Sequence, residues 1–242
     1  MTADSARETR RKTGMNSTLP NPRYERKFTT QTLHVPEVLA LVGRHPALFR
    51  EIYPPRMVNN LYLDSPDLRD YQDHVSGVPH RMKTRIRWNG SWSGAALAAT
   101  LEWKLKSGLV SGKATQPLPP LSMNGSVSLP GLKAALAAAT LPPRRRFALD
   151  QQQPSLLNRY HRHYFLSADR RFRLTVDSGL QFAAAPPAAT LGAPFHPPTS
   201  LVVIELKYDL DAADRAEAIT NRLPLRLARC SKYLLGIDSL KA

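Results

Sequence analysis

The chain has 242 residues, 42% of them hydrophobic, and carries a formal net charge of +15. This length and apolar content suffice for one sizeable core, so we expect a single domain. The positive charge predicts an anionic partner, which could be nucleic acid, an anionic membrane surface or a small polyanion. The single cysteine, Cys230, excludes an internal disulfide framework and is typical of a reducing compartment.

The N-terminal sequence MTADSARETRRKTGMN lacks the apolar core of a signal peptide, and no apolar run reaches the ~20 residues that cross a bilayer. We therefore expect a cytoplasmic protein without a membrane span. Residues 1–22 are polar, basic and without periodicity, which predicts a disordered basic tail. Residues 23–242 then form the single folded domain.

Strand patterns dominate the rest of the chain, with helical spacing in three places. The segment 183–200 is rich in proline and alanine and predicts a flexible loop between two adjacent strands. The composite pattern predicts an α+β fold. Strands are expected at residues 23–29, 58–64, 83–88, 99–106, 156–166, 170–182 and 201–209, and helices at 35–49, 129–141 and 211–223.

The segment KTRIRW, residues 83–88, would place Lys83, Arg85 and Arg87 on one face of a strand and bulkier residues on the other. For one strand, the simplest interpretation is an antiparallel sheet with one solvated face. At least six strands share the pattern, however, and their cations outnumber their acids by more than two to one, which would destabilise a solvated face. If the sheet closes with these faces inward, it encloses a basic channel that needs a polyanion, water and counter-ions.

Other nucleotide and hydrolase signatures are missing from the sequence. It contains no G-x-x-x-x-G-K-[ST] loop, no G-x-G-x-x-G opening a helix and no G-x-S-x-G elbow. The aromatic residues mostly lie on the strand face opposite the cations, whereas a nucleic-acid groove interleaves the two. This argues against nucleic acid and favours phosphate over base as the ligand.

Eight motifs occur in one order between Arg23 and Asp238: RYERKF, NLYLDSPDLRDY, HRMKTRIRW, LEWKLKSGLVSGK, YHRHYF, RFRLTVD, VIELKY and SKYLLGID. Together they resemble the VTC domain, the polyphosphate polymerase domain of the vacuolar transporter chaperone complex. This domain belongs to the triphosphate tunnel metalloenzymes, the wider group that includes the CYTH proteins. The resemblance implies a closed antiparallel β-barrel with a basic interior and helices packed outside.

The resemblance also implies roles for individual residues. Glu205 is similar to the metal-binding carboxylate of the family, for Mn²⁺ or Mg²⁺, while Glu25 and Glu102 are either metal ligands or partners of neighbouring cations. Position 23 is Arg, so only the E-x-K end of the wider group's E-x-E-x-K signature is present, which suits the VTC domain better than the CYTH phosphatases and weakens a two-metal assignment. The implied catalytic residues are Lys27, Arg85, Arg87, Lys104, Arg162, Arg173, Lys207 and Lys232, and the implied further phosphate ligands are Lys83, Lys106, Lys113 and Ser231.

The resemblance implies a polyphosphate polymerase that transfers the γ-phosphate of ATP to a growing polyphosphate chain. Phosphoryl transfer needs positioning and charge stabilisation, so the chemistry requires no covalent nucleophile. One alternative is a tunnel hydrolase of tripolyphosphate or polyphosphate, and another is a non-catalytic polyphosphate-binding module. Glu205 argues against pure binding, which needs only cations. The expected partners are ATP or another triphosphate, inorganic polyphosphate and, for translocation of the product, a separate membrane protein.

Overall fold

The computed structural model describes residues 19–92, 94–123, 127–185, 190–191 and 195–241. Most of the predicted tail, residues 1–18, and parts of the predicted loop, residues 186–189 and 192–194, lie outside the described residues. Within the described part of the chain, no helix combines the length and the apolar character needed to cross a membrane.

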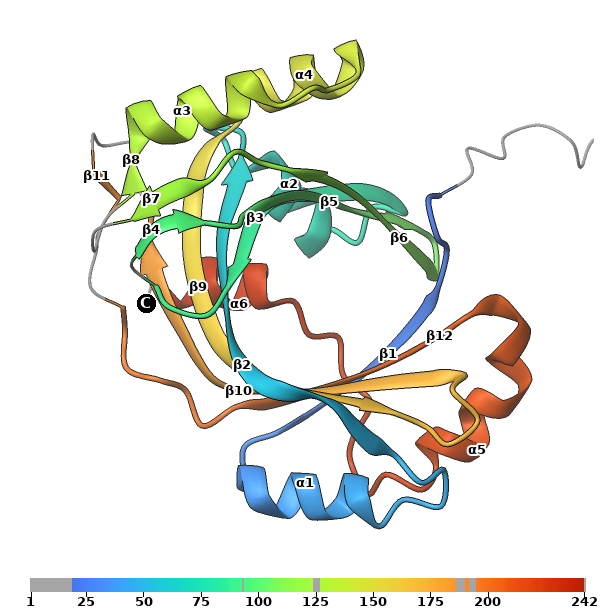
Figure 1. The fold of residues 1–242 in the computed structure, drawn as a ribbon. Helices are drawn as coiled ribbons and strands as arrows, with labels where there is room; N and C mark the ends of the chain where they lie inside the picture. Colours follow the sequence, from blue (N-terminus) through green and yellow to red (C-terminus); the bar gives the residue numbers. More distant parts are fainter. Residues whose placement is uncertain (1–18, 93, 124–126, 186–189, 192–194, 242) are drawn as a thin grey trace, which may run out of the picture.

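Eight antiparallel strands form one strongly curved sheet around a central space (Figure 1). The two faces of the sheet differ because residues alternate along each strand. Apolar residues are buried on one face, and polar residues point to the other. In spatial order the strands are β1 (Tyr24–Thr30), β12 (Val202–Tyr208), β10 (Phe172–Ala184), β9 (Gln153–Leu166), β2 (Arg50–Asp64), β3 (His80–Asn89), β5 (Thr100–Ser107) and β6 (Val110–Pro117).

The two edge strands, β1 and β6, approach each other at one end. Arg23 and Ser111 exchange two backbone hydrogen bonds of 2.9 Å as an isolated bridge, and the Lys113 N–H donates to the Pro20 carbonyl at 3.2 Å. No continuous ladder joins the two edges among the described residues. The sheet therefore has the curvature that was expected, without the fully paired seam of a closed barrel.

Gly112 allows the chain before β1 to lie against β6. A Cβ atom at this position would lie 2.9 Å from the Pro20 carbonyl oxygen, closer than such contacts are found. Residues 19–22, which were predicted as tail, thus already contact the sheet.

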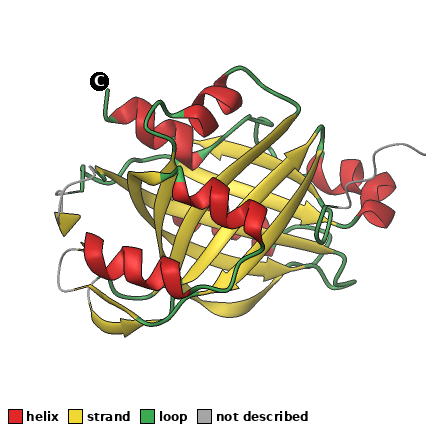
Figure 2. Ribbon diagram, turned by 90° about the horizontal axis from the view of Figure 1, so that it is seen from above, coloured by secondary structure: helices red, strands yellow, loops and turns green. Residues whose placement is uncertain are grey.

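Two apolar clusters on the outer face of the sheet are covered by helices (Figure 2). The first contains Trp88 and Trp103 and lies under α3 (Leu129–Ala138) and α4 (Pro143–Asp150). The second contains Phe28 and Leu206 and lies under α1 (Val35–Gly43), the 3₁₀ helix η1 (Leu210–Arg215) and α5 (Ala216–Thr220). Trp88 is fully buried, as the alternation in KTRIRW predicts, so the expected helices outside the sheet are confirmed.

Helix α6 (Lys232–Ser239) packs on the inner face of the sheet instead. Its Tyr233 and Ile237 join a third apolar cluster with Leu156 and Tyr160, which share a strand face with the inward-facing Arg162. A Cβ at Gly236 would lie 2.4 Å from the Leu156 side chain, so glycine permits this close approach of helix and strand. The sequence analysis had not predicted this helix.

Several element boundaries differ from the prediction for local reasons. Strand β2 begins at Arg50 rather than at residue 58. Its first half was not predicted because Pro54 and Pro55 are typical of a loop rather than of a strand. The helix predicted for 35–49 ends at Gly43, shortly before Pro46, which cannot continue it. The helix predicted for 211–223 is the pair η1 and α5, with Asp209 at the N-cap position of η1.

Helices α2 (Arg69–Val75) and α4 were not predicted. Both helices are too short for a 3.6-residue period to show in the sequence.

A small antiparallel sheet lies beside α3. Its strands are β11 (Thr190–Leu191), β8 (Val127–Ser128), β7 (Leu121–Met123) and β4 (Gly94–Leu97).

Candidate functional site

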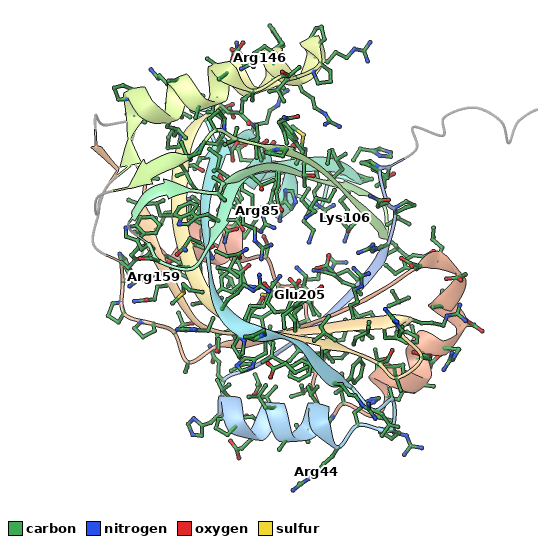
Figure 3. All side chains as sticks on the ribbon, viewed as in Figure 1. Arg44, Arg85, Lys106, Arg146, Arg159 and Glu205 are labelled. Atoms are coloured by element: carbon green, nitrogen blue, oxygen red, sulfur yellow. The ribbon has the colours of Figure 1, made fainter. Side chains whose placement is uncertain are left out.

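The inner face of the curved sheet surrounds a cavity with a strongly basic lining. Figure 3 shows Arg85 and Glu205 projecting toward this space from β3 and β12. Most of the polar strand faces recognised in the sequence converge here, which confirms that they turn inward. Its lining contains ten lysines and arginines and two glutamates: Arg23, Lys27, Lys83, Arg85, Arg87, Lys104, Lys113, Arg162, Lys207, Lys232, Glu25 and Glu205.

The structure brings together most of the residues that the sequence proposes for the site. Arg173, Lys106 and Glu102 are the three that do not line the cavity. Arg173 is exposed and pairs across the sheet with Lys207, and Lys106 pairs across β3 and β5 with Arg81. Those that line it are Lys27, Lys83, Arg85, Arg87, Lys104, Lys113, Arg162, Lys207, Ser231, Lys232, Glu25 and Glu205.

Glu205 lies at the centre of the cavity wall and is 5% exposed. Its carboxylate is 3.0 Å from the Nζ of Lys207, 3.3 Å from that of Lys27 and 3.7 Å from the Arg162 guanidinium. Burial alone would raise the pKa of Glu205, but the surrounding ammonium groups, led by those of Lys207 and Lys27, hold it well below its usual range. Glu205 is therefore ionised at neutral pH.

Asp177 on β10 is a buried carboxylate that the sequence analysis did not select. Arg162 binds it in a fork, with Nε–Oδ1 and Nη2–Oδ2 distances of 2.5 and 2.6 Å, and Lys232 Nζ lies 2.6 Å from Oδ2. Burial would raise the pKa of Asp177, yet Arg162 and Lys232 lower it. Asp177 thus fixes two cations that the sequence had predicted, and its place on the charged face of RFRLTVD was the available signal.

Glu25 on β1 faces Glu205 across Lys27. The Lys27 ammonium is 3.5 Å from Glu25 and 3.3 Å from Glu205, and Lys104 Nζ donates to Glu25 at 2.8 Å. Burial lowers the pKa of Lys104 to about 8, against the attraction of Glu25. We call the residues of this wall the paired cluster: Glu25, Asp177 and Glu205 with Lys27, Arg162, Lys207 and Lys232.

Glu102 on β5 holds Arg85 and Lys113. Arg85 donates from Nε and Nη2 to one carboxylate oxygen at 2.9 and 2.6 Å, and Lys113 donates to the other at 3.0 Å. Both oxygens of Glu102 are therefore occupied by cations. This arrangement favours the second of the two roles expected for Glu102, as a partner of neighbouring cations.

Two cations on β3 lack any such partner, and we call them the open cations. Within the described residues, Arg87 makes no ion pair or hydrogen bond, and Lys83 donates only to the Ser231 hydroxyl, at 2.9 Å. Ser231 is the N-cap residue of α6, so this contact ties β3 to the helix. Burial, with repulsion from Lys104 and Lys27, lowers the pKa of Lys83 well below its usual value.

Three tyrosines, Tyr24, Tyr62 and Tyr160, also line the cavity and were not selected from the sequence as site residues. Tyr160 lies beside Arg162 and Lys232, at 5.2 Å and 4.8 Å from their charged groups, and Tyr62 stacks on Tyr233 of α6. A tyrosine on the charged face of a strand gives little sequence signal, because tyrosine is common on both faces of sheets.

Glu25 and Glu205 are the cavity residues that could hold a divalent cation. Among the described residues, no group of three or more Asp, Glu, His and Cys side chains is arranged to hold a metal. Glu25 and Glu205 nevertheless both reach Lys27 Nζ, and both are ionised. Mg²⁺ in phosphoryl-transfer sites is commonly held by one or two carboxylates together with substrate phosphates and water, and Mn²⁺ suits the same oxygen donors. Glu25 and Glu205 are such a pair.

The VTC domain family matches residues 22–241, and the chain belongs to that family. The fold is shared with the PH1819 protein of Pyrococcus horikoshii OT3, with a TM-score of 0.52 and 13% identity over 90% of this chain and 99% of the other. The HpAC1 protein of Hippeastrum gives a TM-score of 0.50 and 13% identity over 90% and 95%. No curated protein matches the chain significantly.

Proposed function

We propose that the protein is a polyphosphate polymerase that transfers the γ-phosphate of ATP to a growing polyphosphate chain within a basic tunnel. The observation that carries this proposal is the pair of ionised glutamates, Glu25 and Glu205, with side chains 9% and 7% exposed, in a cavity lined by ten lysines and arginines. Such a lining neutralises phosphate oxygens, with arginine binding in a fork and lysine as a point charge. Membership of the VTC domain family supports the same substrate class.

We assign different roles in phosphoryl transfer to different residues of the cavity. The open cations, Lys83 and Arg87, have free donors for phosphate oxygens, and Arg85 is held toward the same space by Glu102. Glu25 and Glu205 would hold a divalent metal ion, whose chemistry when bound would be Lewis-acid activation of the phosphoryl group. Asp177 holds Arg162 and Lys232 in place before substrate arrives, so that little reorganisation accompanies the reaction.

A triphosphatase is the second candidate, since water in place of a polyphosphate end would turn transfer into hydrolysis. The Hippeastrum protein, which shares the fold, is described as having a dominant triphosphatase activity. A non-catalytic phosphate-binding module is the third reading. The two ionised carboxylates oppose it, because their negative charge weakens simple anion binding.

One experiment separates the three functions. Purified protein is incubated with ATP labelled in the γ-phosphate and with Mn²⁺, and the products are separated by gel electrophoresis. Labelled long-chain polyphosphate is the expected result. Labelled free phosphate alone would contradict polymerisation and identify a hydrolase. Unchanged ATP together with measurable polyphosphate binding would identify a binding module.

A further inference from the structure

Three side chains continue the inner wall beyond the cavity, where β2 and β9 run next to each other (Figure 1). Tyr53 of β2 pairs across the strands with Tyr164 of β9, and Arg56 pairs with Arg162, which lines the cavity. Residues directly opposite each other in an antiparallel pair point to the same side of the sheet. Arg56 therefore lies on the inner wall, directly beside the phosphate-sized cavity.

An irregularity in β2 brings Tyr53 and Arg56 to the same side. They are three positions apart on β2, whereas their partners Tyr164 and Arg162 are two apart on β9. In a regular strand, residues three apart face opposite sides, but one extra residue in a β-bulge restores a common face. Pro54 and Pro55 fill the gap, which suits residues that have no N–H to offer a ladder.

The three side chains form a compact stack. The Arg56 guanidinium lies 5.3 Å from the ring centroid of Tyr53 and 5.0 Å from that of Tyr164. The two rings meet edge to face at 5.8 Å, and Tyr164 also lies 5.9 Å from the Arg162 guanidinium. Tyr53 is 52% exposed. Rings and guanidinium groups thus alternate in a row that leads from the cavity to solvent.

Arg56 has none of the acidic support that its neighbour receives. Arg162 is bound by Asp177, whereas Arg56 makes no ion pair or hydrogen bond within the described part of the chain. Two guanidinium groups that face each other across strands repel, so the position favours an anionic ligand. The half-exposed ring of Tyr53 offers a flat apolar surface at the same place, which a purely phosphate ligand would leave unused.

We propose that Tyr53, Arg56 and Tyr164 form a nucleoside subsite, which stacks on the base of a nucleoside triphosphate whose phosphates occupy the cavity. The inference rests on the proposed function and specifies its donor, because inorganic tripolyphosphate has no flat group for the rings to contact. Stacking on tyrosine and arginine tolerates every base, since each has a π-face, and the larger purine face gains more. The sequence pattern indicated phosphate alone. The bulge at Pro54 and Pro55, which places an aromatic ring and a cation on the same face, could not be recognised from the sequence.

The test compares a nucleotide with its inorganic counterpart. The dissociation constants of ATP and of tripolyphosphate are measured calorimetrically in excess chelator, so that metal-dependent turnover does not consume the ligand. For Tyr53→Ala, we expect the affinity for ATP to fall about ten-fold and the affinity for tripolyphosphate to stay unchanged. Tyr53→Phe keeps the ring and should bind both ligands like the wild type. Phe147→Ala removes another exposed ring, on α4 outside the sheet, and is the matched control.

Each outcome assigns the failure to one of the two proposals. Wild-type ATP affinity in Tyr53→Ala would overturn the nucleoside subsite and leave the proposed function intact. An equal loss for ATP and tripolyphosphate would also overturn it, because Tyr53 would then act on the phosphates or on folding. If the wild-type protein binds neither ligand, the proposed function itself is wrong, and the subsite is wrong with it.

Discussion

The inner wall holds its positive charges in two different ways. In the paired cluster, Lys27, Arg162, Lys207 and Lys232 share three buried carboxylates. On β3, the open cations face the same space without an ion pair or hydrogen bond to any carboxylate among the described residues. Residue type and strand face are the same in both regions. The difference lies in whether a carboxylate on the same or another strand pairs with the cation, and it separates cations that are fixed in advance from cations that a ligand must neutralise.

The two regions respond differently to an empty cavity. A buried ion pair roughly balances desolvation against attraction, and it becomes costly only when one partner is removed. An unpaired buried cation instead carries its desolvation cost until an anion arrives, as the lowered pKa of Lys83 reflects. The paired cluster therefore contributes mainly geometry, and the open cations contribute mainly the affinity for phosphate.

The largest expected effect comes from removing the central acid of the paired cluster. We expect Glu205→Gln to lower the rate of phosphoryl transfer with Mn²⁺ by more than ~10³-fold, because both a metal ligand and a fixed charge are lost. Tripolyphosphate affinity without metal should stay the same or increase, since a negative charge leaves the cavity. A wild-type rate in this variant, or full activity in excess chelator, would contradict the metal role of Glu205.

A smaller effect is expected for Asp177→Asn, which should lower the stability of the folded protein. Asp177→Asn leaves Arg162 and Lys232 without their main partner, and removing one member of a buried pair costs about 3–5 kcal/mol of unfolding free energy. Urea denaturation followed by circular dichroism measures this loss. The exposed Asp214 is the matched control, and Asp214→Asn should change stability by less than ~0.5 kcal/mol. Equal stability of the two variants would show that the paired cluster is not a structural unit.

The sequence predicts which strand residues face inward and which face outward, because alternation with a period of two does not depend on the details of packing. Trp88 and Ile86 are buried and Arg85 and Arg87 line the cavity, as that pattern predicts. The curvature of the sheet could not be derived in this way and came from the resemblance to the VTC domain. Helix α6 was hidden as well, because a helix of two turns is too short for a 3.6-residue period to stand out in the sequence.

The carboxylate partners of the cations could not be predicted from the sequence either. Sequence shows that Arg85 and Arg87 share a face, but only the register of β3 with β5 shows that Arg85 lies opposite Glu102. A shift of that register would give the glutamate to another cation. The bulge at Pro54 and Pro55 was equally invisible, so the stack of Tyr53 on Arg56 had no counterpart in the sequence pattern.

The smallest expected effect is on the pH dependence of binding. The pKa of Lys104 is about 8 in the empty cavity, and the anion binds the protonated form. Affinity for tripolyphosphate is therefore fully present well below pH 8 and falls as the pH rises through 8, by about ten-fold at pH 9. Lys104→Met removes this titration and serves as the reference for the ligand's own ionisation. Parallel pH profiles of the two proteins would show that Lys104 stays charged throughout.

The most direct test concerns the open cation Arg87 and uses thermal melting with and without tripolyphosphate. A ligand raises the melting temperature in proportion to the logarithm of its concentration over its dissociation constant. We expect the wild type and Arg44→Ala, which changes an exposed arginine on the outside (Figure 3), to show the same shift. Arg87→Ala should melt at or above the wild-type temperature without ligand and show a clearly smaller shift with it. A full tripolyphosphate shift in Arg87→Ala would contradict the account, because the open cations of β3 would then not bind the phosphates.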